Sequence, residues 1–262
     1  MSKYWQRRDQ VEREVLFKKL QAELNKELAR LYRITLNELK VDIYMLYDEI
    51  TQGDYIISDL YKYNKYYDLM NKIHDKLNEL GQKEVAVFEP ELIKMYKQNS
   101  TQIGHLFGLG ASIDEESAIK VVSSIWCSDG KNWSDRIWDN KAKLQNKIEQ
   151  GLFDIISRGA PRSDLIKELM QDFGVSFHQA QTLVRTELTY VQNRSTLDKF
   201  TDAGVQEFEF LATDDERECD ECAKLDGKRF RIINSQVGIN TPPIHPNCRC
   251  SMLAVVPKPQ GM

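Results

Sequence analysis

The chain has 262 residues, of which 41% are hydrophobic, so it is long enough for one large domain or two smaller ones with a sizeable core. No apolar run approaches the about 18 residues that a membrane-spanning helix needs, and no apolar segment of a secretory signal follows the first residues. We therefore expect a protein that is made in the cytoplasm, where clustered thiols stay reduced, and that has no membrane partner. The net charge of −4 argues against general affinity for nucleic acid.

The charge is unevenly distributed in the last third of the chain. Residues 207–222 carry eight acidic side chains and one basic one, whereas residues 223–262 carry six basic side chains and one acidic one. We favour the interpretation that the two segments face each other in the fold. The alternative is a local contact with the phosphates of DNA, for which the expected residues are Lys228, Arg229, Arg231 and Arg249.

The first hundred residues predict long helices, because apolar side chains recur at steps of three and four residues from Val11 to Leu31. Helix-capping residues, glycine and proline predict where these helices end or begin: near residues 33–37, at Gly53, at Gly81 and at Pro90. Seven tyrosines lie between residues 44 and 67, and such a cluster favours a packed core or a subunit interface over stacking on bases.

The second half predicts further helices followed by strands. Helices are expected at residues 114–122, 134–158, 163–174 and 176–200, the last with a capping box of Ser176 and Gln179. Strands are expected at residues 205–211, 228–233 and 251–256. The sequence therefore predicts an α+β fold that is mainly α-helical, with long N-terminal helices, a helical body and a small C-terminal β unit. We expect a helical region at residues 1–125, a domain at residues 126–256 and a tail at residues 257–262.

Four of the five cysteines and one of the four histidines lie within residues 219–250. A Cys-x-x-Cys pair brings two thiolates to one cation, and a Pro-rich turn supplies a second group of donors. A structural zinc ion is the favoured explanation, while disulfides or simply packed thiols remain alternatives. The candidate ligands outnumber the four positions of a tetrahedral site, and either Cys248 or Cys250 could complete it: Cys219, Cys222, His245, Cys248 and Cys250.

No pattern of an enzyme active site accompanies these donors. The sequence contains no His-Glu-x-x-His, no phosphate-binding glycine loop, no Gly-x-Ser-x-Gly and no zinc deaminase signature. Arg185 and Glu187 are two residues apart on an expected helix and so point to different sides of it. We therefore assign no catalytic residue, no small-molecule substrate and no enzymatic activity.

An ordered series of motifs resembles a known family. The series comprises Trp126, Trp133-Ser134-Asp135-Arg136-Ile137-Trp138, Arg185-Thr186-Glu187, Cys219-Asp220-Glu221-Cys222, Leu225-Asp226-Gly227 and Pro242-Pro243-Ile244-His245-Pro246-Asn247-Cys248-Arg249-Cys250. It is similar to the phage Mu F-like minor head proteins, which take part in head morphogenesis of tailed phages and prophages. The resemblance covers residues 126–256, and its most specific part is the ordered combination of Cys-x-x-Cys, Leu-Asp-Gly and Pro-Pro-x-His-Pro-Asn-Cys-Arg-Cys.

The resemblance implies a minor capsid protein that acts at or near the portal, with a further expected role in DNA packaging or ejection. The implied partners are the portal protein, the major capsid protein and phage DNA. The implied location is the virion, in the head interior or at the portal vertex, with the host cytoplasm as the place of assembly. The Cys/His cluster would be the metal knuckle of the family. The alternative function is a zinc-dependent nuclease-like enzyme, or a DNA-binding module, that acts on packaged DNA.

Overall fold

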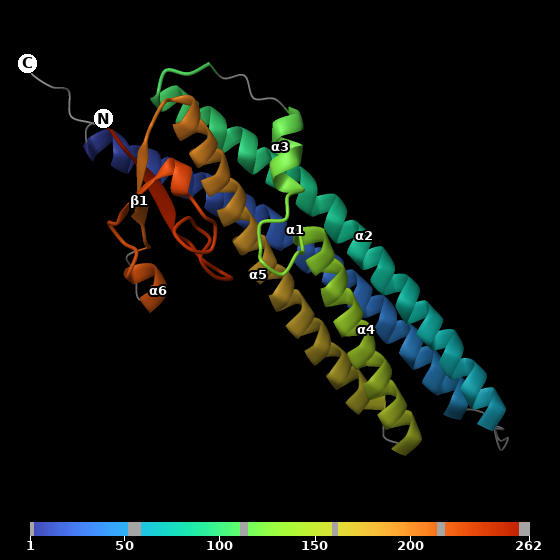
Figure 1. Cartoon of the computed structure of the whole chain (residues 1–262). Coiled ribbons are helices and arrows are strands. Elements are labelled where there is room, and N and C mark those ends of the chain that lie inside the picture. Colours follow the sequence, from blue (N-terminus) through green and yellow to red (C-terminus); the bar gives the residue numbers. More distant parts are fainter. Residues whose placement is uncertain (1–2, 52–58, 111–114, 159–161, 214–217, 257–262) are drawn as a thin grey trace, which may run out of the picture. The chain divides into compact units, whose positions relative to one another are not determined.

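A computed structural model describes residues 3–51, 59–110, 115–158, 162–213 and 218–256 of the chain (Figure 1). The α-helices in these ranges are α1 (Lys3–Thr51), α2 (Asp59–Leu106), α3 (Glu115–Val122), α4 (Trp133–Arg158), α5 (Arg162–Asp202) and α6 (Asp220–Ala223). The strands are β1 (Glu207–Leu211), β2 (Arg229–Arg231) and β3 (Ser251–Val255), and a 3-10 turn, η1, spans Ile232–Asn234. The predicted fold class, mainly α-helical with a small C-terminal antiparallel sheet, is confirmed.

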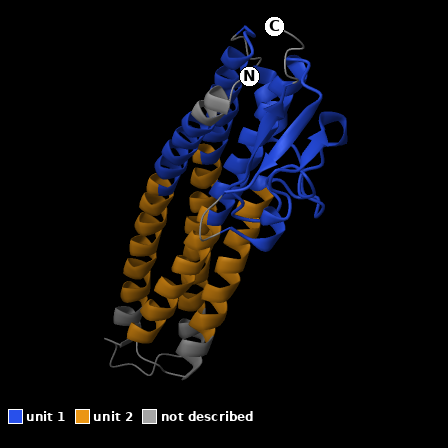
Figure 2. Ribbon diagram, turned by 90° about the vertical axis from the view of Figure 1, so that its left-hand side faces the viewer, with its two compact units in different colours: residues 1–25, 88–133, 182–262 blue, residues 26–87, 134–181 orange. Residues whose placement is uncertain are grey.

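The chain forms two compact units, each of which is assembled from separate segments (Figure 2). Unit 1 comprises residues 1–25, 88–133 and 182–262, and unit 2 comprises residues 26–87 and 134–181. The helices α1, α2 and α5 contribute residues to both units. The predicted division at residue 125 stays a prediction. Within the described ranges, no helix is both long enough and apolar enough to cross a membrane.

The break predicted near residues 33–37 is wrong, because α1 continues without interruption. Thr35 does not cap a new helix. Its side chain is buried and belongs to a stripe of buried residues on one face of α1 that continues with Leu39 and Ile43. The stripe repeats every three or four residues, so packing of this face in unit 2 outweighs the weak capping preference of a threonine.

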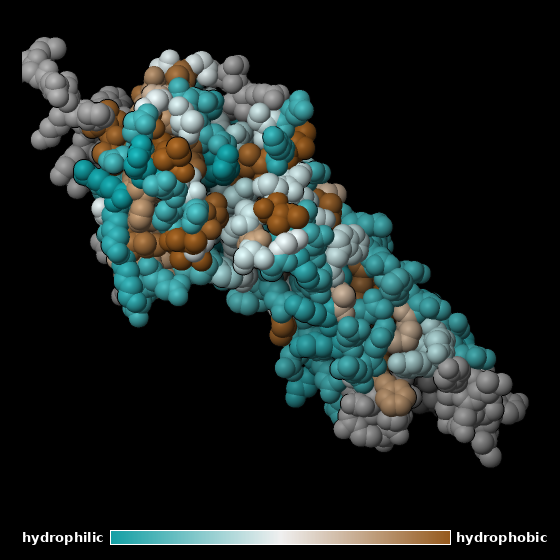
Figure 3. Space-filling model, in the orientation of Figure 1, coloured by the Kyte–Doolittle hydropathy of each residue, from teal (hydrophilic) through white to brown (hydrophobic). Residues whose placement is uncertain are grey.

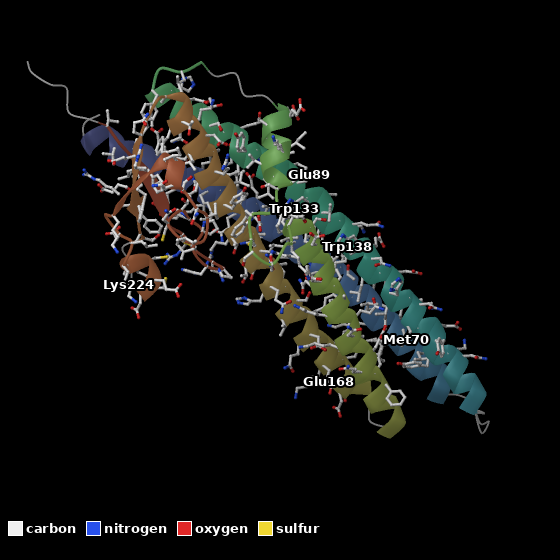
Figure 4. The ribbon with its side chains drawn as sticks, viewed as in Figure 1. Met70, Glu89, Trp133, Trp138, Glu168 and Lys224 are labelled. Carbon is white, nitrogen blue, oxygen red and sulfur yellow. The ribbon has the colours of Figure 1, made fainter. Side chains whose placement is uncertain are left out.

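Gly81 does not end a helix either, and α2 passes through it. A Cβ atom at Gly81 would lie 2.6 Å from the ring of Trp138 on α4. The glycine therefore permits close approach of a helix and an indole ring within unit 2 (Figure 4, where Trp138 is labelled).

The other predicted interruptions inside helices are also wrong. Pro90 lies within α2 and does not begin a helix; it is on the exposed face, where water can satisfy the carbonyl that loses its amide partner. Residues 162–202 form the single helix α5, although two helices were predicted there. Ser176 is buried, and its hydroxyl donates to the Asn140 side chain at 3.0 Å instead of capping a helix. In contrast, α3 and α4 begin within one residue of their predicted starts.

A buried polar layer joins all four helices of unit 2. The Lys141 ammonium on α4 contacts the Glu84 carboxylate on α2 and the Tyr32 hydroxyl on α1. The Tyr32 hydroxyl lies 3.1 Å from the Ser176 hydroxyl on α5. Glu84 is 0% exposed and Lys141 is 3% exposed, and burial raises the pKa of Glu84 and lowers the pKa of Lys141. Such a layer is satisfied in only one alignment of the helices, so it favours a single register.

The C-terminal sheet of unit 1 has the strand order β2-β1-β3, and both pairings are antiparallel. Phe208 and Phe210 of β1 are fully buried on one face of the sheet, as its alternating burial requires. Phe208 packs in a cluster with Phe200 of α5 and Met252 of β3. The sheet is thus attached to the end of α5 by a small apolar core, and the loops around it carry the Cys/His donors.

We expect Lys141→Met to lower the free energy of unfolding by about 3–5 kcal/mol, because the Glu84 carboxylate is left buried without its cation. Replacing both residues by methionine is expected to restore most of the loss. Chemical denaturation of the purified variants measures both effects. Lys83→Met, which breaks the exposed Lys83–Glu79 pair, is the control and is expected to cost less than about 1 kcal/mol. An equal cost for Lys141→Met and Lys83→Met would contradict the role assigned to the buried layer.

Candidate metal centre

The Cys-x-x-Cys pair lies at the start of α6, between β1 and β2 of unit 1. Cys219 is the N-cap of this short helix, and its Sγ atom accepts a hydrogen bond from the backbone N–H of Cys222 at 3.4 Å. An N-cap thiolate can accept this bond and still bind a cation with its other lone pairs, so the turn aims both sulfur atoms at one point. In Figure 4, Lys224 is labelled at the end of this helix.

The second group of donors comes from the turn that precedes β3. The Cys248 N–H donates to the His245 carbonyl at 3.1 Å, which closes the turn. Asn247, inside it, has a φ of 64°, a left-handed conformation that asparagine adopts more readily than most residues. The closed turn presents His245 and Cys248 to the same side, toward α6.

The structure brings all five predicted donors together in two groups that share Cys222. Cys219, Cys222 and His245 form one group, and Cys222, Cys248 and Cys250 form the other, with the donor atoms of each group within 4.8 Å of one another. The His245 Nε2 atom lies 3.0 Å from the Cys219 Sγ and 3.4 Å from the Cys222 Sγ.

The separation of two of the sulfur atoms fits the geometry of a tetrahedral metal ion. The Cys222 and Cys248 sulfur atoms are 3.9 Å apart. Two thiolates bound to one tetrahedral ion at about 2.3 Å would be separated by about 3.8 Å, whereas a disulfide bond is about 2.05 Å long. The four cysteines of the cluster are free thiols. Four ligands for one ion would have to come from both groups, so the two groups would close around a bound ion.

The hydrogen bonding of His245 prepares it as a ligand. Its Nδ1 atom lies 2.8 Å from the Pro246 carbonyl, which can only accept, so Nδ1 carries the proton. The Nε2 atom, which faces the two cysteines, then has a free lone pair in the neutral ring. Burial lowers the pKa of His245, but the Pro246 carbonyl, Cys248 and Cys219 together raise it above its usual value.

The thiols differ in their readiness to ionise. A hydrogen bond from Cys250 lowers the pKa of Cys248 to about 5, and the same contact, together with burial, raises the pKa of Cys250. Burial also raises the pKa of Cys222. In the Cys248–Cys250 pair, Cys248 is therefore the thiolate and Cys250 keeps its proton.

Apolar packing surrounds the sulfur atoms. Cys222, Cys248 and Cys250 are buried in a cluster with Phe210 of β1 and Ala212. Asp220 and Glu221, the acidic residues between the first two cysteines, are exposed. The cluster therefore offers thiol and imidazole donors in an apolar setting, a donor set that suits zinc better than calcium or magnesium.

One face of α5 holds the backbone of the donor turn, a feature that the sequence analysis missed. The Thr186 hydroxyl accepts a hydrogen bond from the Asn247 N–H at 3.0 Å. The Thr189 hydroxyl donates to the Cys248 carbonyl at 2.7 Å, and the Asn193 amide donates to the Cys250 carbonyl at 3.0 Å. The three α5 residues are spaced i, i+3 and i+7 and so lie on one face of the helix. The available signal was the recurrence of small polar side chains along this face.

Glu187, which the sequence analysis noted beside Arg185, is buried on α5 and accepts a hydrogen bond from the Trp126 indole at 3.0 Å. The Trp126 ring stacks on Tyr190 of α5, with ring centroids 5.0 Å apart. Trp133, labelled in Figure 4, stacks on Phe88 of α2 and donates to the Val122 carbonyl. These contacts fix the segment before α4 within unit 1.

The four residues predicted to contact DNA lie near the sheet but differ in their surroundings. Arg229 donates to Glu209 of β1 at 3.0 Å, and Arg231 lies across from Glu207 in the strand register. Acidic and basic segments therefore do face each other along β1 and β2. Lys228 is exposed, while Arg249 is half-buried between two cluster cysteines. A role of these residues in DNA binding stays a prediction.

Comparison with known proteins identifies one family. Residues 146–253 match the family model described as Phage Mu protein F like protein. The match spans α5, β1, β2, the first residues of β3 and every donor of the cluster. No curated protein and no solved structure matches the chain.

We expect Thr189→Val to lower the free energy of unfolding by about 1–3 kcal/mol, because the Cys248 carbonyl loses its buried donor. Thr201→Val is the matched control on the same helix: its hydroxyl donates to the Leu197 carbonyl of its own helix, so its loss leaves the backbone ladder intact. Urea denaturation compares the two variants. Equal stability of the Thr189 and Thr201 variants would show that α5 does not hold the donor turn.

Proposed function

We propose that the chain is a minor head protein of a tailed phage or prophage that acts in head morphogenesis, because residues 146–253 match the family model described as Phage Mu protein F like protein. The family match carries this proposal. We further propose that the protein acts at or near the portal vertex, that its partners are the portal protein and the major capsid protein, and that it assembles in the host cytoplasm and remains in the virion.

We infer that the Cys/His cluster binds one zinc ion through Cys219, Cys222, His245 and Cys248. The 3.9 Å separation of the Cys222 and Cys248 sulfur atoms supports this choice, as do the short distances from the His245 Nε2 atom to the Cys219 and Cys222 sulfur atoms. Cys250 then stays a thiol that donates a hydrogen bond to the Cys248 sulfur. Zinc would stabilise the fold by joining α6 to the turn before β3.

A structural role for this ion follows from the number of donors. A catalytic zinc site keeps one position open for water, whereas this cluster offers five protein donors for four positions. The carboxylates nearest in sequence, Asp220 and Glu221, are exposed and on the outside of α6. The observations therefore favour an assembly protein over a zinc-dependent nuclease.

A contact with packaged DNA is a secondary part of the proposal. Lys228 and Arg231 are exposed, which supports a phosphate contact, but Glu209 already binds Arg229 and Glu207 lies opposite Arg231. The carboxylates of β1 lower the positive electrostatic potential around these cations of β2. For this reason a role in DNA packaging or ejection through direct DNA binding is less well supported than protein contacts.

We expect about one zinc ion per chain in protein purified without added metal, as measured by inductively coupled plasma mass spectrometry. Cys222→Ser and Cys248→Ser are expected to lose the ion, because each removes one of the four ligands. Cys250→Ser is expected to retain it. Cys127→Ser is the control, since this residue lies outside the cluster.

Two results would contradict the assignment of the ligands. Loss of zinc in Cys250→Ser with retention in Cys248→Ser would show that Cys250, and not Cys248, is the fourth ligand. Wild-type protein that contains no metal and keeps its C-terminal fold would show that the cluster is not a structural zinc site.

We expect purified phage particles to contain the chain in few copies, and particles assembled without it to be defective. Quantitative mass spectrometry of gradient-purified heads measures the copy number, and plaque counts measure infectivity. Complementation with the wild-type gene in trans controls for effects on neighbouring genes. Fully infectious particles that lack the chain would contradict the proposed function.

A further inference from the structure

The segment of residues 232–241, which we name the isoleucine loop, follows β2 and includes η1. Two of its side chains are among the most exposed large apolar ones of the described residues: Ile233 is 81% exposed and Ile239 is 64% exposed. Single exposed apolar residues are common on protein surfaces and need no explanation. Two such residues in one ordered loop are less common. Figure 3 shows apolar side chains gathered over the sheet and its loops on the face in view.

A dense set of internal hydrogen bonds holds the isoleucine loop. The Gln236 carbonyl accepts from the backbone N–H groups of Asn240 and Thr241, each at 3.1 Å. The Asn240 side chain accepts from the Gln236 N–H at 2.8 Å and donates to the Asn234 carbonyl at 2.9 Å. Thr241 is buried at the base of the loop. The loop therefore keeps its conformation although its two isoleucines face water.

We propose that the isoleucine loop is a preformed docking surface that inserts Ile233 and Ile239 into an apolar pocket of a partner protein in the phage head, and that acidic side chains border this pocket. The inference rests on the proposed function for the identity of the particle. An ordered loop loses little conformational entropy on binding, so the burial of its side chains contributes more fully to affinity.

The exposed cation that adjoins the loop, Arg231, favours an acidic border for the pocket, although Glu207 lies opposite it in the strand register. Arg231 is two residues from Ile233, and Lys228 precedes β2. Both side chains are exposed, and neither forms an ion pair with any residue that the structure describes. Carboxylates of a partner can pair with them as the isoleucines are buried, which would orient the contact and speed association.

A protein pocket explains these features better than a lipid surface does. A myristoyl chain, which has more carbon atoms than the two isoleucine side chains together, gives only marginal membrane binding. The polar residues between the isoleucines, such as Asn234 and Gln236, would also have to enter the headgroup region. A pocket in a protein can match this mixture of apolar and polar groups.

A second copy of the chain is a poorer partner. In a symmetric dimer through this loop, each copy would present the same surface to the other. Arg231 adjoins Ile233, so near the two-fold axis it would lie close to its own copy, and this like-charge contact opposes association. The partner with the complementary charge is therefore a different protein.

The test uses cells that produce the phage without its own copy of the gene and receive full-length variants in trans. The double variant Ile233→Ser with Ile239→Ser is compared with Ile125→Ser, which removes an isoleucine that is 58% exposed at another site of unit 1. Copies per head are counted by mass spectrometry. Full burial of two isoleucines predicts at least about a tenfold loss of copies for the double variant and no loss for Ile125→Ser. Unchanged zinc content and unfolding midpoint of the purified double variant exclude misfolding.

The outcomes separate the two proposals. If the wild-type chain is absent from heads, the proposed function fails and the inference fails with it. If the wild type is present and the double variant enters heads equally well, only the docking surface is overturned. Isoleucine-dependent sedimentation with vesicles of equal parts phosphatidylcholine and phosphatidylglycerol would overturn it in favour of a lipid contact. Isoleucine-dependent dimers in sedimentation velocity would overturn it in favour of a second copy.

Discussion

The backbone of residues 247–250 is held from two sides, and the arrangement of the C-terminal part of unit 1 depends on it. On one side, Thr186, Thr189 and Asn193 of α5 bond to three backbone groups of the turn. On the other side, the thiols and the imidazole of the cluster converge. Strands of five, three and five residues form too small a sheet to be stable alone, and such units in proteins are usually joined to a larger core or to a metal. Here α5 supplies the larger core, and the proposed zinc ion would act on the same turn.

The sequence predicted the element types well because the signals for them are local. Alternating burial at residues 207–211 and the period of α4 are properties of a few neighbouring side chains. The helix ends were predicted less well because they depend on distant contacts. Gly81 lies inside a helix, where its missing side chain makes room for the Trp138 ring. Ser176 does not cap a helix, because its hydroxyl binds Asn140 on another helix. Neither partner can be identified from the residues next to the glycine or the serine, so local stop and start signals were assigned where the helix continues.

The sequence predicted the donor residues of the candidate site, but it did not predict the residues of α5 that hold the donor turn. Thiol and imidazole groups have few other reasons to gather, so the spacing of Cys219, Cys222 and His245 was informative by itself. Threonine and asparagine occur in many roles, and only the placement of the turn against α5 reveals what Thr189 and Asn193 do. The same reasoning applies to Glu187, whose partner Trp126 lies far away in the chain. The family match over residues 146–253 includes both the donors and this supporting helix.

We propose that a closed zinc site holds the turn against α6, while α5 holds the other side of the turn. X-ray absorption at the zinc edge of the purified full-length chain tests it most directly. We expect three sulfur atoms at about 2.3 Å and one nitrogen atom at about 2.0–2.1 Å, with no oxygen ligand. A shell that includes a water oxygen would indicate an open site and contradict the structural role. A shell of four sulfur atoms would exclude His245 as a ligand and contradict the proposed set.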